Sequence, residues 1–251
     1  MPSISAIVIT LNEEKRIQAC LDSISWVDEI IVVDSGSTDR TRQIANGMVT
    51  RLVESEWLGF AETKALAVKH TTGDWILWVD ADEIVPDSLS AEIRSRVGQD
   101  GNIMGFMVPR KAIFLGKWIR HCGWYPGYVC RLFKREHGEF TGRLVHESVT
   151  IDGRTDRLKN HLIHYTDDSL EHYLHKFNKY TTLGARQLQQ DGNAFHLKDL
   201  ILRPPFMFVK MYLLKLGILD GIQGFILCFL SSCYVFTKYA KLWHLQQGQP
   251  E

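Results

Sequence analysis

The chain has 251 residues, of which 45% are hydrophobic, and this suits a single globular protein with one sizeable core. A formal net charge of zero and the lack of a recognition motif disfavour a nucleic-acid-binding protein. The charge is uneven, because residues 1–100 contain 9 Lys/Arg and 17 Asp/Glu, whereas residues 101–251 contain 20 and 12. The acidic half could hold a cation, and the basic half could meet anionic groups.

The cysteines and the N-terminus indicate the compartment. The five cysteines are scattered and have no Cys-x-x-Cys spacing, which favours reduced thiols over a zinc site. No basic segment followed by an apolar segment precedes the first apolar run, so we expect no secretory signal. The sequence therefore predicts a cytoplasmic protein.

The first hundred residues alternate between apolar runs and helical patterns. We expect strands at 4–10, 29–34, 49–53 and about 75–80, with helices after the first two strands and at 60–70. Ser37 or Thr38 is expected to cap the second helix, after a tight turn at Gly36. This alternation predicts a parallel sheet with right-handed crossovers.

Polar side chains follow these apolar runs, at the strand ends where α/β proteins bind ligands. Asp34 ends the second run, and Asp80, Asp82 and Glu83 follow the fourth. Three carboxylates so close together require a cation, and carboxylates favour Mg²⁺ or Mn²⁺. The pattern predicts a nucleotide-type crevice with a divalent metal.

Three motifs, ITLNEE at 9–14, VVDSGSTD at 32–39 and WVDADE at 78–83, resemble those of family 2 glycosyltransferases. The resemblance implies the GT-A fold, a Rossmann-like mixed α/β sheet. Within the family the chain is most similar to bacterial β-1,4-glucosyltransferases of lipopolysaccharide and lipooligosaccharide core assembly. This narrower likeness rests on His146-Glu147 and on the segments 169–185, 216–221 and 239–243.

The resemblance implies a UDP-sugar donor and a set of residues that contact it. These are Thr10, Leu11, Asn12, Glu13, Asp34, Ser35, Lys64, Asp80 and Ala81. Asp34 would accept the uracil imide N–H, and Glu13 would lie near the ribose. Asp80, Asp82 and a late histidine, His164, are the implied metal ligands. Two alternatives stay open, since Glu13 could be a first-turn helix carboxylate and Lys64 a solvated helix lysine.

Inverting sugar transfer needs a general base for the acceptor hydroxyl, and Glu147 is our candidate. Relatives often have a Glu-Asp pair where this chain has His146-Glu147. The alternative is a strand carboxylate paired with Arg143. Between Arg110 and Arg143, basic residues alternate with aromatic ones, which suits binding of sugar rings and phosphates.

The last third is expected to be helical. Ser169 should cap a helix that ends near residue 190, and Arg203-Pro204-Pro205 should break the chain before 206–219 and 221–243. The apolar part of the last segment, 221–236, is short of a membrane span, and residues 198–245 contain six Lys/Arg and two Asp. We expect a C-terminal amphipathic extension that binds anionic membrane; an ordinary helix pair or a dimer interface is the alternative.

These observations predict three parts: a donor-binding half at 1–100, an acceptor-binding half at 101–195 and a membrane-associating segment at 196–251. The predicted enzyme transfers a hexose, glucose from UDP-glucose, to a heptose of the lipopolysaccharide inner core, peripherally at the inner membrane. Two rivals remain: transfer to a polyprenyl phosphate or another surface polysaccharide, and a catalytically silent sugar-nucleotide-binding scaffold.

Overall fold

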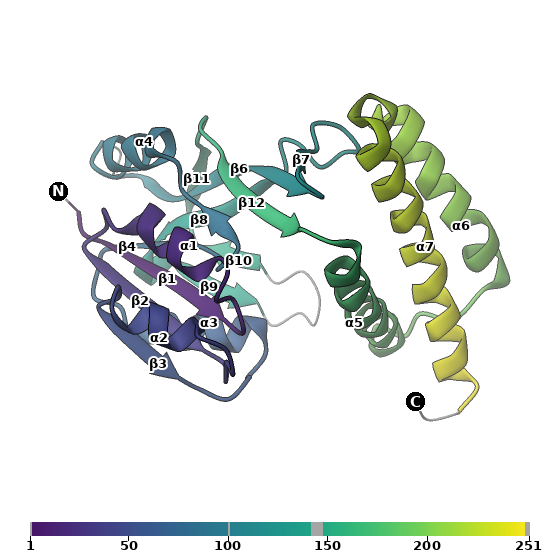
Figure 1. The fold of residues 1–251 in the computed structure, drawn as a ribbon, viewed down its shortest axis with the longest axis horizontal. Helices are drawn as coiled ribbons and strands as arrows, with labels where there is room; N and C mark the ends of the chain where they lie inside the picture. Colours follow the sequence, from purple (N-terminus) through teal and green to yellow (C-terminus); the bar gives the residue numbers. More distant parts are fainter. Residues whose placement is uncertain (1, 100, 142–147, 249–251) are drawn as a thin grey trace. The chain divides into compact units, whose positions relative to one another are not determined.

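The structure is a computed structural model that describes residues 2–99, 101–141 and 148–248. The chain forms two compact units. Unit 1 comprises Met1–Lys111 and Gly127–Tyr165, and unit 2 comprises Ala112–Pro126 and Thr166–Glu251. This division follows contacts between elements and does not test the predicted functional parts. Figure 1 labels the elements of both units.

Unit 1 is built on a mixed sheet with the strand order β3-β2-β1-β4-β8-β6-β12-β5. Its strands are β1 (Ile4–Thr10), β2 (Glu29–Asp34), β3 (Arg51–Glu54), β4 (Trp75–Trp78), β5 (Glu83–Ile84), β6 (Ile103–Phe114), β8 (Tyr128–Lys134), β11 (Arg154–Arg157) and β12 (Leu162–Asp167). Strands β4, β1, β2 and β3 are parallel neighbours, as predicted for the first hundred residues. The sheet becomes mixed where β8 pairs antiparallel with both β4 and β6.

Helices cover both faces of this sheet (Figure 1). They are α1 (Ile17–Ile24), α2 (Thr41–Asn46), α3 (Phe60–Lys69) and α4 (Asp87–Val97), with a short helix η1 (Arg135–His137) and a hairpin of β9 (Gly138–Thr141) and β10 (Ser148–Ile151). Apolar residues of α1, α2 and α4 pack on one side of β1 and β4. The other side packs against α3 and the β9–β10 hairpin. Because β1 and β4 are covered on both faces, nearly all their residues are buried, as their continuous apolar runs indicate.

One predicted cap is wrong. Helix α2 begins at Thr41, and neither Ser37 nor Thr38 caps it. Instead the Ser37 hydroxyl bonds to Asp34 in the turn after β2, where Gly36 has a φ of 93°. The Ser37 N–H also donates to Asp34, at 2.9 Å, so both polar groups of Ser37 belong to the turn.

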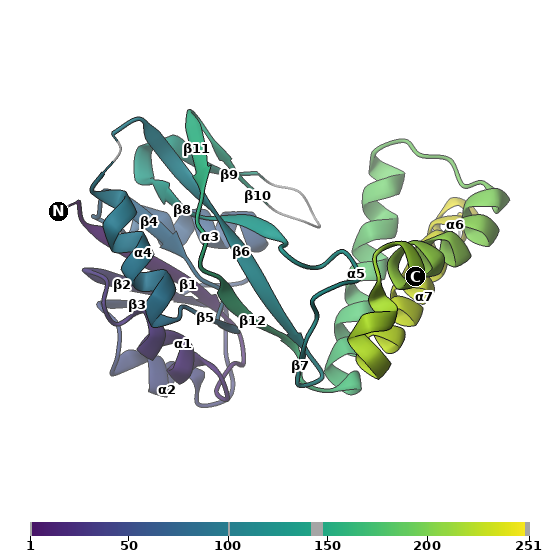
Figure 2. The same cartoon turned by 90° about the horizontal axis from the view of Figure 1, so that it is seen from above.

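Unit 2 is mainly helical. Its elements include β7 (Lys117–Trp118), α5 (Leu170–Gln190), α6 (Leu197–Val209), η2 (Lys210–Leu214), η3 (Gly217–Asp220) and α7 (Gly221–Gln246). Figures 1 and 2 show α6 and α7 side by side, and α5 also packs on α7. The predicted cap of α5 is confirmed, since the Ser169 hydroxyl accepts the N–H of His172 at 3.1 Å.

The predicted break at Pro204-Pro205 is wrong, because both prolines lie inside α6. Proline cannot donate the backbone hydrogen bond that a helix interior requires. Packing against α7 holds this part of the helix: Pro204 is buried, and its carbonyl accepts a hydrogen bond from the Ser232 hydroxyl of α7 at 2.8 Å. The helix therefore continues through a site where local sequence alone favours a stop.

Helix α7 is longer than expected. It runs to Gln246. The stretch Gly217–Gln246 is long and apolar enough to cross a membrane, and 28% of its apolar 18-residue segment is buried. The sequence pattern ended the apolar segment at Phe236 and predicted one too short to span a membrane. The length of the helix does not support that expectation. Length and composition by themselves are weak evidence, since a core helix can meet the same criteria.

Candidate active site

The loops after β1 and β2 are joined by hydrogen bonds. The Asn12 N–H donates to the Ser37 hydroxyl at 2.9 Å, and the Asn12 side-chain oxygen accepts the N–H of Thr38 at 2.8 Å. The Glu13 N–H donates to the Thr41 hydroxyl at 2.8 Å. Asn12 has a φ of 57°, a conformation that asparagine tolerates better than most residues. Two of the three motifs are thus joined into one hydrogen-bonded pair of loops at the carboxyl ends of the strands.

The buried Asp34 carboxylate holds the loop after β2 in place. Its side chain is fully buried and accepts the N–H groups of Gly36 at 3.1 Å and Ser37 at 2.9 Å. Thr10 pairs with Asp34 across the two strands. Within the described part of the chain, the buried hydroxyls of Thr10 and Ser35 have no hydrogen-bond partner. A buried polar atom without a partner is costly, so these hydroxyls are suited to a ligand.

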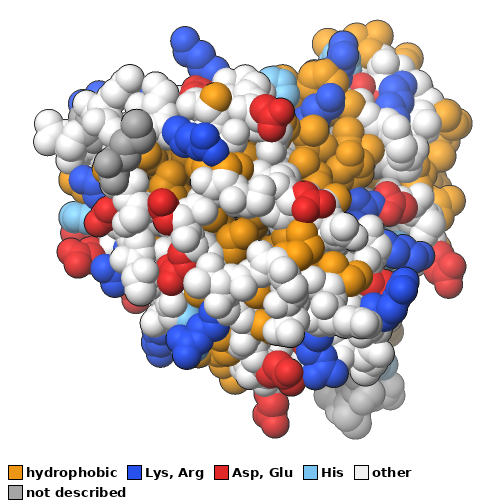
Figure 3. Space-filling view, turned by 60° about the vertical axis from the view of Figure 1, so that its left-hand side comes forward, with side chains coloured by type: hydrophobic (Ala, Val, Ile, Leu, Met, Phe, Trp, Pro, Cys, Tyr) orange, Lys and Arg blue, Asp and Glu red, His pale blue; other side chains and the backbone are white. Residues whose placement is uncertain are grey.

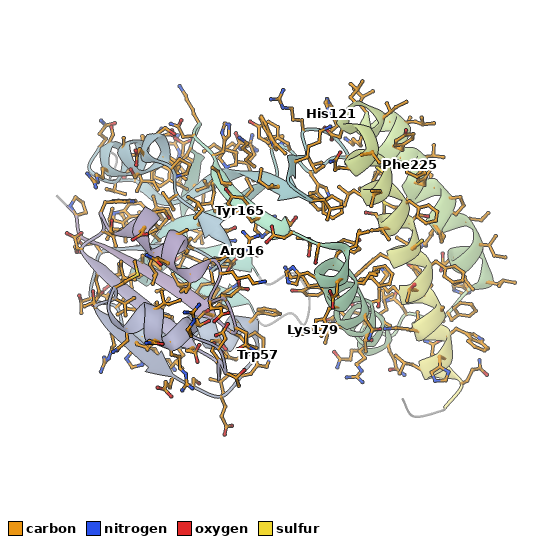
Figure 4. All side chains as sticks on the ribbon, viewed as in Figure 1. Arg16, Trp57, His121, Tyr165, Lys179 and Phe225 are labelled. Atoms are coloured by element: carbon orange, nitrogen blue, oxygen red, sulfur yellow. The ribbon has the colours of Figure 1, made fainter. Side chains whose placement is uncertain are left out.

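Three further residues of the predicted donor site, two after β1 and one after β4, differ in exposure. Leu11 is 46% exposed, Glu13 is half-buried and Ala81 is buried. The Glu13 carbonyl accepts the N–H groups of Arg16 and Ile17, which leads into α1. Arg16 also lies 4.8 Å from the ring centre of Tyr165 (Figure 4). Nucleotide contact by Leu11, Glu13, Asp34 and Ala81 stays a prediction.

The Asp80 carboxylate lies among three donors. Its Oδ1 accepts the Trp78 indole N–H at 2.9 Å and lies 3.7 Å from Nζ of Lys64. Its Oδ2 lies 2.5 Å from Nη2 of Arg131. Burial opposes ionisation, but the nearby Arg131 and Lys64 charges hold the pKa of Asp80 well below its usual range.

Lys64 is not a solvated helix lysine. Its side chain is 1% exposed, and its Nζ lies 3.7 Å from the centre of the Trp78 ring as well as beside Asp80. The alternative of a solvated lysine is therefore wrong. Direct contact with the nucleotide stays a prediction.

Glu83 corrects the expectation that three carboxylates lie at the mouth of the site. It is fully buried in β5, accepts the Asp80 N–H at 3.0 Å and lies 2.6 Å from Nη2 of Arg131. Burial, together with the Asp80 charge, raises the pKa of Glu83 in spite of Arg131. The cluster does not need a metal to be tolerated, because Arg131 and Lys64 supply cationic charge.

Asp82 and His164 lie together. Strand β12 pairs antiparallel with β5, so that His164 is opposite Glu83, and the Tyr165 N–H donates to the Asp82 carbonyl at 3.0 Å. This pairing leaves Nε2 of His164 3.3 Å from Oδ2 of Asp82. Burial lowers the pKa of His164, but the Asp82 carboxylate outweighs it, so that the pKa is raised. A carboxylate and an imidazole side by side could both ligate a divalent cation.

Arg131 is the residue of this cluster that the sequence reasoning missed. It lies in β8, 2% exposed, with its guanidinium carbon 3.8 Å from the centre of the Trp78 ring. A signal exists in the sequence, since Arg131 is a single charge within the run Val129-Cys130-Arg131-Leu132-Phe133. A cation in the middle of a buried strand predicts a buried acidic partner.

The candidate base and a hollow at the other edge of the sheet remain to be placed. The candidate base Glu147, with His146, lies outside the described residues, so its role stays a prediction. A hollow of about 610 Å³ opens at the opposite, amino-terminal edge of the sheet, and its Lys134 and Arg135 donate to backbone carbonyls. We place the active site at the carboxyl edge because the strand-end motifs converge there.

Comparisons with known proteins identify the family of the chain. The family model for glycosyl transferase family 2 matches residues 5–148, which include the strand-end motifs. The chain is 29% identical to the lipopolysaccharide core biosynthesis glycosyltransferase LpsC of Rhizobium meliloti (strain 1021), over 98% of this chain and 95% of the relative. It is 39% identical over 102 residues to glucosyl-3-phosphoglycerate synthase of Mycobacterium tuberculosis, covering 35% of this chain and 31% of the relative.

A solved structure shares the fold. The mannosyltransferase of Pyrobaculum calidifontis in complex with GDP-Man and Mn²⁺ is similar with a TM-score of 0.57, at 17% identity, over 96% of this chain and 87% of that one. This likeness shows the fold alone, and it confirms the expected GT-A architecture. Since the family model spans more than half of the sequence, the chain belongs to glycosyl transferase family 2.

Proposed function

We propose that this glycosyltransferase uses a UDP-sugar, UDP-glucose, and transfers the glucose with inversion to a heptose of the lipopolysaccharide inner core. The observation that supports it best is the carboxyl edge of the sheet. There Asp82 and His164 lie together, and Asp80 is paired with Arg131. The full-length likeness to a protein named for lipopolysaccharide core biosynthesis favours this acceptor. The likeness to a glucosyl-3-phosphoglycerate synthase favours a glucosyl donor.

The described residues fit a divalent metal with few protein ligands. No group of three His, Cys, Asp or Glu side chains in the described ranges is arranged to hold a metal. Asp82 and His164 would supply two ligands, and diphosphate oxygens would supply others, which is common for Mg²⁺ and Mn²⁺ sites. A bound cation would neutralise the charge that develops on the departing diphosphate.

The protein's own groups would do the rest. The partnerless hydroxyls of Thr10 and Ser35 would bind the nucleoside, beside the buried turn of Asp34. Lys64 and Arg131 would add positive charge behind Asp80, close to the diphosphate. Glu147 would take the proton of the acceptor hydroxyl as that oxygen attacks the anomeric carbon from the opposite side.

We further propose that unit 2 binds the cytoplasmic face of the inner membrane through an apolar face of α6, η2, η3 and the start of α7. Its most exposed side chains are Leu197, Ile201, Leu202, Phe206, Leu214, Leu219 and Ile222, each more than half exposed. Figure 3 shows hydrophobic side chains gathered with lysine and arginine at the upper right of the visible face. Exposed apolar patches of this extent mark interaction surfaces.

The charges around this apolar face favour an anionic membrane. Lys198, Lys210 and Lys215 are exposed, whereas Asp199 is held by Arg203 at 2.6 Å and Asp220 is 2% exposed. Apolar burial and attraction to anionic headgroups act together in interfacial binding. A membrane-bound enzyme of this kind would meet a lipid-linked acceptor at the bilayer surface.

The enzymatic proposal is tested by measuring UDP release. The purified protein would be given Mn²⁺, a panel of UDP-sugars and purified core oligosaccharides, with GDP-mannose as a control donor whose GDP release is measured in parallel. We expect UDP release that depends on the acceptor and is fastest with UDP-glucose. Release only with a polyprenyl phosphate would assign another acceptor, and binding of UDP without transfer to any acceptor would indicate the silent scaffold.

A further inference from the structure

Arg131 connects the carboxylates of Asp80 and Glu83. Its Nη2 lies 2.5 Å from Oδ2 of Asp80 and 2.6 Å from Oε1 of Glu83. The rest of the guanidinium lies over the Trp78 ring, and its Nε and Nη1 have no hydrogen-bond partner within the described chain. Stacking on the indole therefore fixes the plane of the guanidinium, and Nη2 alone contacts the carboxylates of Asp80 and Glu83.

The two carboxylates differ in exposure. Glu83 is fully buried, whereas the side chain of Asp80 keeps 28% of its surface exposed. Trp78 and Lys64 hold Oδ1 of Asp80, and Arg131 holds Oδ2, so the carboxylate cannot rotate without losing a charged contact. Only its remaining exposed edge can meet a ligand.

We propose that Arg131 is a positioning residue for the donor: it holds the Asp80 carboxylate in one orientation, with its open edge toward the UDP moiety. This inference rests on the proposed function. It separates the roles of the two aspartates, since Asp80 is occupied by protein cations and Asp82 lies beside His164. The alternative is that Arg131 only neutralises the buried Glu83, with no effect through Asp80.

A double-mutant cycle separates these roles. Arg131→Lys keeps one positive charge but loses the planar stack, so UDP affinity in the presence of Mn²⁺ should fall about tenfold or more. If Arg131 acts through Asp80, this loss should shrink to less than about twofold in an Asp80→Asn background. It should persist in a Glu83→Gln background. Ligand-observed NMR with UDP as the probe measures weak as well as tight binding.

A second variant guards against loss of folding. Arg131→Met with Glu83→Gln removes the buried pair without leaving a buried charge at position 83, and thermal melting would establish that it folds. We expect this folded double variant still to bind UDP at least about tenfold more weakly than the wild type. Arg96→Gln is the matched control, because Arg96 also makes a 2.5 Å ion pair, with Asp156, but is partly exposed.

The outcomes are distinct. The proposal is overturned if Arg131→Lys still lowers UDP affinity about tenfold in the Asp80→Asn background. It is also overturned if the Arg131→Met/Glu83→Gln protein binds UDP within about twofold of the wild-type affinity. Failure of the proposed function would look different, because the wild-type protein itself would then neither bind UDP nor release it from a UDP-sugar.

Discussion

Nε2 of His164 lies 3.3 Å from Oδ2 of Asp82, although 81 residues separate them in the sequence. The pairing of β12 with β5 brings them together, because His164 is then directly opposite Glu83, the neighbour of Asp82. Asp80, by contrast, is held by Arg131 and Lys64. Asp82 and His164 are therefore the side chains of this edge best suited to bind a metal.

Loss of this pair should remove metal-dependent activity. We expect Asp82→Ala to abolish transfer and to weaken binding of a UDP-sugar when Mn²⁺ or Mg²⁺ is present, because one of two protein ligands is lost. His164→Ala should raise the Mn²⁺ concentration needed for half-maximal activity. Activity would be measured by UDP release across a Mn²⁺ titration. Full activity of Asp82→Ala, or of the wild type in EDTA, would exclude the metal-dependent mechanism.

The proposed general base should affect turnover and not donor binding. Glu147→Gln should lower kcat by about 10²- to 10⁴-fold, the usual contribution of general base catalysis, while UDP-sugar affinity stays the same. Steady-state kinetics and donor titration would be compared, with Glu139→Gln as a control on the preceding strand β9. A parallel loss of donor affinity would instead identify Glu147 as a structural carboxylate.

Membrane binding should depend on the apolar face of unit 2. Leu214→Asp with Leu219→Asp introduces charge at two side chains that are 68% and 63% exposed, and it should release the protein from liposomes that contain anionic lipid. Leu58→Asp in unit 1, at a 51% exposed leucine, is the matched control and should leave binding unchanged. Co-sedimentation measures both. If the wild type binds neutral and anionic liposomes equally, the electrostatic part of the proposal is wrong.

The close approach of η3 to the first turn of α7 should be sensitive to a single methyl group. At Gly224 a Cβ atom would lie 2.1 Å from the Gly217 carbonyl oxygen, a backbone atom that cannot move aside cheaply. We expect Gly224→Ala to destabilise the protein by about 2 kcal/mol or more and to lower its melting temperature. Gly98→Ala, where nothing lies within 4 Å, should have little effect. Equal melting temperatures for both variants would contradict the close approach.

Glu92 should make stability depend on pH. It accepts N–H groups of Lys159 at 2.9 Å and Asn160 at 2.8 Å, and although burial opposes ionisation, these bonds lower its pKa. A lowered pKa in the folded state adds stability above the unfolded value of about 4.3, and this is lost as the pH falls through the folded value.

Glu92→Gln should therefore lower the melting temperature near pH 7, and its difference from the wild type should shrink toward about pH 3. The exposed Glu56→Gln, which removes the same charge, should change stability little at either pH. Thermal melts at both pH values measure the effect. A difference that grows as the pH falls would show that the sign is wrong.

Much of this protein follows from local sequence. The apolar runs at 4–10, 29–34 and 75–78 predict buried parallel strands, because a strand covered on both faces has no polar side. The polar residues that follow them predict a ligand site, since parallel strands end at one edge of the sheet. The cap at Ser169 is likewise a short-range hydrogen bond that the sequence displays directly.

What only the tertiary structure decided involves partners far apart in the chain. The prolines of α6 lie inside a helix that packs on α7, where Ser232 donates to the Pro204 carbonyl, and local propensity cannot show such a contact. The sequence leaves open whether Lys64 is a donor-site residue or a solvated helix lysine, and its contacts with Asp80 and Trp78 exclude the solvated lysine. Arg131 is a counter-charge of Asp80 and Glu83 that the local sequence does not show, because the ion pair depends on how β8 and β4 meet and not on the residues beside Arg131.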